Sequence, residues 1–86
     1  MSEKIDVQQA LKAFQIITDL GERTARGYEW TGLVATSDVD GYTVQISDGA
    51  VTLHLMFHQK FAVDSPNRRA TANFMKRLDH LLEHYG

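Results

Sequence analysis

The chain has 86 residues, of which 43% are hydrophobic and 23% are charged, and its formal net charge is −2. This length predicts a single domain over residues 1–86, and the composition is that of an ordinary soluble globular protein. The small net charge gives no strong field toward nucleic acid or an anionic membrane, so neither is expected as a partner. The absence of cysteine excludes disulfides, thiolate catalysis and cysteine-based zinc sites.

No apolar run approaches the ~20 residues that a membrane-spanning helix needs. The first six residues, MSEKID, contain no apolar run and do not resemble a signal peptide. We therefore expect a cytoplasmic protein.

Residues 6–20 have the apolar spacing of an amphipathic helix. Its stripe consists of Ala10, Leu11, Phe14, Ile17 and Leu20. Asp6 is a candidate N-cap with Gln9 three residues later, and Gly21 suits a left-handed position after the helix. Ile16 falls off the stripe and is expected to be partly exposed.

Three strands are expected next, over residues 28–35, 42–47 and 50–57. The last two alternate between apolar and polar residues, and Asp48-Gly49 between them is a strong signal for a two-residue hairpin loop. That loop pairs Ile46 with Val51 and Val44 with Leu53, and it places the apolar residues of both strands on one face.

The side on which Trp30 lies depends on the length of the turn at 37–41. An odd-length turn places Trp30 on the core face together with Tyr28 and Val34. An even-length turn exposes these residues and buries Thr31, Leu33 and Ala35 instead. The first arrangement buries more apolar area and is favoured.

Residues 66–84 form the second predicted helix, with Ser65 as its cap and Pro66 in its first turn. Its stripe contains Ala70, Phe74, Leu78 and Leu81, widened by Met75, Leu82 and Tyr85. The predicted fold is therefore α+β with the order α-β-β-β-α: a three-stranded antiparallel meander with two helices packed on one face.

The stretch SDVDGYT, residues 37–43, is interpreted first as a turn between strands, because Asp and Gly favour turns. It does not match a calcium-binding EF-hand loop, since its first position is Thr36 and its twelfth is Ser47. A looser divalent-cation site is the alternative, in which Asp38, Asp40 and His58 converge at one end of the sheet, with Asp64 as a further ligand.

Other polar groups favour no enzyme. No Ser-His-Asp set or glycine-rich phosphate loop is present. His80 and His84 share a helix face, but two histidines fall short of the three protein ligands usual for catalytic zinc. The basic residues of the second helix are interpreted as a solvated face.

Several exposed residues suggest a contact surface instead. His54 and Met56 lie on the outward face of the third predicted strand, and Leu33 could join them in a modest apolar patch for a partner.

The stretch SDVDGYTVQISDGAVTLHLMFHQK resembles a family of small bacterial proteins catalogued only as a domain of unknown function. The likeness consists of an opening helix that ends in GE, a DxDGYTV strand start, and a strand that ends in FH before a lysine. Gln59 departs from the asparagine expected after FH. The resemblance implies no activity, cofactor or catalytic residue.

The sequence thus predicts an uncharacterised, non-enzymatic interaction module without a cofactor. It would act through a protein partner or as a homodimer, using the open sheet face or the second helix. Weak cation binding at Asp38, Asp40 and His58 is the alternative.

Overall fold

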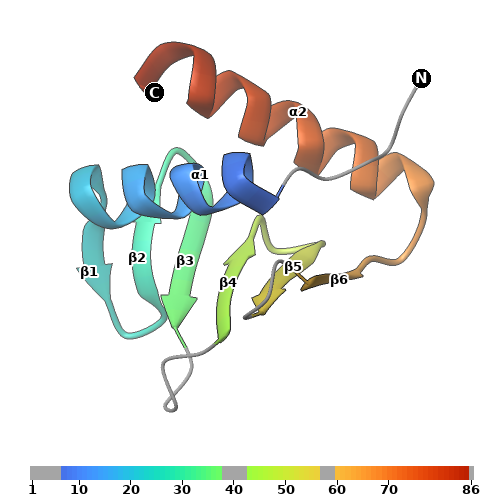
Figure 1. Cartoon of the computed structure of the whole chain (residues 1–86), viewed down its shortest axis with the longest axis horizontal. Coiled ribbons are helices and arrows are strands. Elements are labelled where there is room, and N and C mark those ends of the chain that lie inside the picture. Colours follow the sequence, from blue (N-terminus) through green and yellow to red (C-terminus); the bar gives the residue numbers. More distant parts are fainter. Residues whose placement is uncertain (1–6, 38–42, 57–59, 86) are drawn as a thin grey trace.

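The computed structural model describes residues 7–37, 43–56 and 60–85. Within these residues the chain forms a helix, a six-stranded antiparallel meander and a second helix (Figure 1). The elements are α1 (Val7–Leu20), β1 (Glu22–Thr24), β2 (Gly27–Trp30), β3 (Leu33–Ser37), β4 (Thr43–Ser47), β5 (Thr52–Met56), β6 (Lys60–Asp64) and α2 (Arg68–Tyr85). The α+β class and the two helices are confirmed, whereas the three-stranded sheet is corrected to six strands. Neither helix of the described chain is long and apolar enough to cross a membrane.

The predicted strand over residues 28–35 is in fact two strands, β2 and β3, joined by Thr31 and Gly32. Both turn residues have positive φ angles, 50° and 83°, and Trp30 pairs with Leu33 across the turn. Two positive φ angles in a two-residue loop are the mark of a type I′ hairpin, whose twist matches that of the flanking strands. The glycine that seemed only to interrupt a strand therefore reverses the chain.

This reversal decides where Trp30 lies. Trp30 pairs with Leu33 and Tyr28 with Ala35, so all four side chains lie on the same face of the sheet. The favoured arrangement is therefore confirmed for Tyr28 and Trp30 and wrong for Val34, and the alternative is right only for Leu33 and Ala35. Each assumed one continuous strand, in which residues 30 and 33 point to opposite faces. Val34 lies on the opposite face.

The β4–β5 hairpin has the predicted faces but a different register. Ile46 pairs with Leu53 and Val44 with Leu55, two residues away from the predicted pairing. The cause is a longer loop. The carboxylate of Asp48 accepts hydrogen bonds of 2.9 Å from the backbone N–H groups of Ala50 and Val51, and Asp48 N–H donates to the Val51 carbonyl oxygen at 3.2 Å. A shift of two residues preserves the alternation of faces, so the apolar pattern could not detect it.

Both helices and one face of the sheet contribute to a single buried cluster. Its members are Ala10, Ala13, Ile16 and Ile17 of α1, Leu33, Ala35, Ile46, Leu53 and Leu55 of the sheet, Val51 of the β4–β5 loop, and Phe74, Leu78 and Leu81 of α2. The predicted stripe of α2 is confirmed at its centre. In α1, Ile16 is only 9% exposed, against expectation, while Leu11 and Leu20 are exposed. Ile16 is buried because the core side of α1 is wider than one stripe: α2 also packs beside α1.

The helix ends differ from the predicted caps. The side chain of Asn67 caps α2, accepting a 2.8 Å bond from Ala70 N–H, while Ser65 Oγ donates to the Asn67 carbonyl oxygen. The predicted cap of α1, Asp6, lies outside the described residues. Gly21 has no positive φ; a Cβ there would lie 2.7 Å from the Glu29 carbonyl oxygen. Gly21 thus allows β2 to approach the end of α1.

We expect Gly21→Ala to lower the free energy of unfolding by on the order of 2 kcal/mol, because the added methyl group forces two backbone segments apart. Urea denaturation followed by circular dichroism measures this loss. A midpoint equal to that of the parent protein contradicts the close approach.

Thr31 is a β-branched residue with φ at 50°, which is a strained conformation that asparagine tolerates better. We expect Thr31→Asn to raise the free energy of unfolding by about 1 kcal/mol. The matched control is Thr31→Val, which keeps the branched Cβ and its strain and should give no gain. An equal gain in both variants excludes backbone strain as the cause.

Candidate functional site

The predicted cation site, Asp38, Asp40 and His58, lies outside the described residues. Among the described residues, no group of three or more His, Asp or Glu side chains is placed to hold a metal ion. Asp64, the further ligand considered, is the last residue of β6 and pairs with Thr52 of β5.

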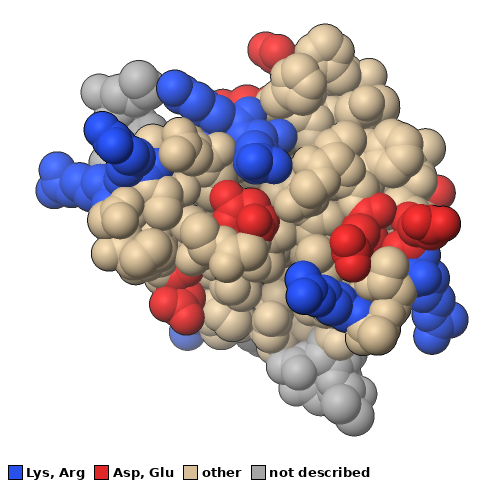
Figure 2. Space-filling model, turned by 180° about the vertical axis from the view of Figure 1, so that it is seen from behind, with Lys and Arg blue, Asp and Glu red and all other residues tan. Residues whose placement is uncertain are grey.

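The predicted contact patch is divided between the two faces of the sheet. His54 and Met56 lie on the open face, where Gln45 pairs with His54 and Thr43 with Met56. Leu33 is fully buried on the helix-covered face, because the Thr31–Gly32 turn reverses its side. Its inclusion was wrong. The described residues paired with His54 and Met56 are polar apart from Ala62. Figure 2, the molecule seen from behind, shows acidic and basic residues interspersed among uncharged ones. The described residues of this face include no exposed large apolar side chain other than Met56.

Trp30 occupies the end of the core between the two helices. Its ring packs edge-on against Tyr85, with 5.5 Å between centroids. Its Nε1 is the only buried side-chain polar atom of the described residues that lacks a hydrogen-bond partner. The indole is therefore half-buried and packs against the edge of the core.

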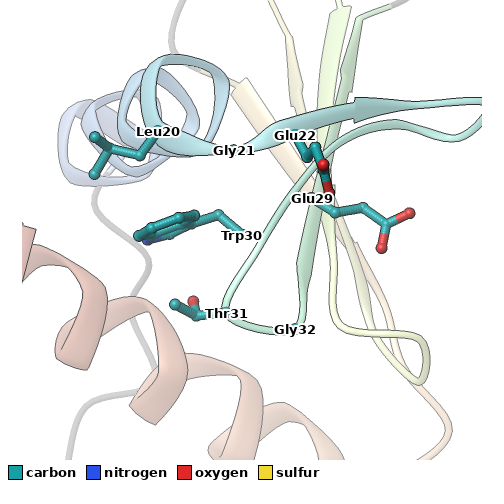
Figure 3. A pocket seen from close by; sticks show the side chains of 7 residues that line it. All are labelled: Leu20, Gly21, Glu22, Glu29, Trp30, Thr31 and Gly32. Atoms are coloured by element: carbon teal, nitrogen blue, oxygen red, sulfur yellow. The ribbon is translucent and has the colours of Figure 1, made fainter.

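A shallow hollow lies beside Trp30. It is lined by Leu20, Gly21, Glu22, Glu29, Trp30, Thr31 and Gly32. Glu22 and Glu29 are direct cross-strand partners, and like charges in such a pair repel each other. Figure 3 shows the Glu29 carboxylate pointing away from the indole, so the polar groups of the hollow do not converge on a common point. The hollow has no arrangement suited to acid–base catalysis.

His80 and His84 lie on one face of α2, as predicted, and their ring centroids are 4.1 Å apart. No third metal-ligating side chain joins them within the described part of the chain. Nearby, Lys76, Arg77, His80 and Thr31 surround a separate hollow. This hollow lies between the β2–β3 turn and α2, which is the more basic of the two helices.

The least protected element is β6, an edge strand of the sheet. All five of its residues are exposed, including Phe61 at 42% and Val63 at 36%. Phe61 pairs with Leu55 and Val63 with Leu53, so both apolar side chains are on the helix-covered side. Both side chains nevertheless remain partly exposed on that side.

Sequence reasoning missed β6 because residues 60–64 were interpreted as a loop. The available signal was the alternation in Lys-Phe-Ala-Val-Asp, where Phe61 and Val63 are two apart. Five residues are a short window, and no turn dipeptide separates them from the preceding strand.

A search of the curated proteins and a search of the solved structures found no match. A family model described as "Protein of unknown function (DUF3081)" matches residues 5–86, nearly the whole chain. This match identifies the family of unknown function that the SDVDGYT region and the FH at the end of the third predicted strand resemble. The chain belongs to the DUF3081 family.

Proposed function

We propose that this protein is a non-enzymatic interaction module that self-associates by pairing β6 with the β6 strand of a second copy. One observation carries the proposal: a five-residue edge strand leaves Phe61 and Val63 exposed. Edge strands present unpaired backbone groups, and proteins usually protect them by making them short, charged or covered. The other edge, β1, follows that rule, with three residues that include Glu22 and Arg23.

The order of residues in β6 is complementary to its own reverse. In an antiparallel pair centred on Ala62, Lys60 of each copy faces Asp64 of the other, and Phe61 faces Val63. Opposite charges and apolar pairs directly across two strands each contribute roughly 0.2–1 kcal/mol. A shift of two residues in either direction removes both charge pairs. The centred register is thus the only one in which all five residues find suitable partners.

The symmetry of this pairing is also favourable. A two-fold axis through Ala62, perpendicular to the sheet, reverses the strand direction and keeps each face on its own side. Phe61 and Val63 of both copies then form one continuous apolar row beside the two helical layers. The joined sheet would have twelve strands, with β1 as its edge at both ends.

The contact is short, which sets the expected strength. Stable interfaces usually bury at least ~1,200 Å² in total, and a pair of five-residue strands buries less than this unless the neighbouring helices also meet. We therefore expect a reversible dimer whose population rises with protein concentration.

Sedimentation velocity over a concentration series tests the proposal. The parent protein should shift from monomer to dimer, and Lys60→Asp should weaken the dimer about tenfold or more, because each of its two charge pairs becomes a repulsion. Asp64→Lys should have the same effect for the same reason.

The double variant Lys60→Asp/Asp64→Lys is the matched control, because it restores opposite charges across the two-fold axis. It should recover dimerisation, whereas a purely structural effect of either substitution would persist or add. A parent protein that stays monomeric at millimolar concentration, or a double variant as weak as the singles, overturns the proposed pairing.

A further inference from the structure

A second surface, independent of β6, is the hollow between α2 and the β2–β3 turn. Its volume is about 340 Å³, and its lining consists of Thr31, Lys76, Arg77 and His80. Three of these four side chains carry nitrogen atoms that donate hydrogen bonds, and the fourth carries a hydroxyl group. None of the described residues that line the hollow carries a carboxylate. Its chemistry therefore suits an anion.

Arg77 is held in place by the shape of the turn. A Cβ atom at Gly32 would lie 2.6 Å from Nη1 of Arg77, so the guanidinium rests directly against the glycine. Among the described residues, neither Arg77 nor Lys76 forms an ion pair with a carboxylate. The guanidinium is thus positioned by packing, and its charge is not neutralised by a neighbour within that part of the chain.

The β2–β3 turn places Thr31 in a backbone conformation that threonine rarely adopts. Type I′ turns prefer Asn, Asp or Gly at the position of Thr31, whose φ is 50°. A strained residue persists where its surroundings fix it, and such residues gather at binding sites. Figure 3 shows the Thr31 side chain extending from the turn on the side that faces α2. Thr31, the strained residue, is therefore also one of the residues that line the hollow between α2 and the β2–β3 turn.

We propose that this hollow binds the phosphate group of a small phosphate monoester. Lys76 and Arg77 supply two positive charges, which match the charge of a phosphate dianion. The guanidinium fork suits two phosphate oxygens, and the ammonium and hydroxyl groups are additional donors. A hollow of this size falls at the lower end of the range of small-ligand pockets, which leaves room for a short organic group beside the phosphate.

The test is a titration of ¹⁵N-labelled full-length protein, followed by NMR, with sodium phosphate in one arm and glycerol 3-phosphate in the other. Sodium chloride at matched ionic strength is the reference. We expect saturable shifts at the amides of Thr31 and Gly32 and at the Nε–H of Arg77, with tighter binding of the monoester. Shifts that do not saturate, that fall outside these residues, or that show no preference for the monoester overturn the proposal.

Two variants test the residues directly. Arg77→Gln should weaken glycerol 3-phosphate binding about tenfold, the usual scale for one charge-assisted contact. Arg69→Gln removes the same charge from an exposed position of α2 outside the hollow and should leave the affinity unchanged. Equal weakening by both variants indicates general electrostatic attraction and excludes a defined site. Spectra that retain the parent shifts away from the hollow confirm that each variant is folded.

Discussion

Two consecutive positive φ angles, at Thr31 and Gly32, turn the chain between β2 and β3 and determine the side of every residue in β2. Because of this turn, Tyr28 and Trp30 lie on the same face as Leu33 and Ala35, and the helices cover all four. The Trp30 ring then packs edge-on against Tyr85 at the end of α2, so this hairpin and the second helix meet at one end of the core. Because Gly32 has no side chain, the Arg77 guanidinium can pack directly against the same turn.

The sequence was sufficient for features that depend on periodicity and insufficient for those that depend on loop geometry. The 3.6-residue spacing placed α1 and the centre of α2, and the two-residue alternation placed Val44, Ile46, Leu53 and Leu55 on one face. The register of β4 against β5 could not be predicted, because a shift of two residues leaves the alternation intact. The hydrogen bonds of the Asp48 carboxylate set that register, and only three-dimensional structure reveals them.

Of the candidate site residues, His54 and Met56 were placed on the correct face, and Leu33 was not. Leu33 was misplaced because the Thr31–Gly32 turn was taken as an interruption within one strand, so that β2 and β3 were predicted as a single element. Strands of three to five residues contain too few alternations to be recognised by pattern alone, which is why β1 and β6 were missed. Their importance lies in their position at the edges of the sheet, a property of topology that no local window contains.

The two proposed surfaces are both places where the sequence breaks a local rule. Thr31 occupies a turn position that favours asparagine or glycine, and β6 carries exposed apolar side chains on an edge that proteins usually protect. Natural sequences are otherwise locally consistent, so a departure without a compensating contact within the described chain points to a contact with another molecule. For β6, its reversed copy supplies the missing charge and apolar partners. For the turn, the positive charges of Lys76 and Arg77, which form no ion pair within the described chain, indicate the kind of ligand.

Because β6 lies at one edge of the meander and the turn joins β2 to β3, pairing at the edge leaves the hollow between α2 and that turn open in each copy.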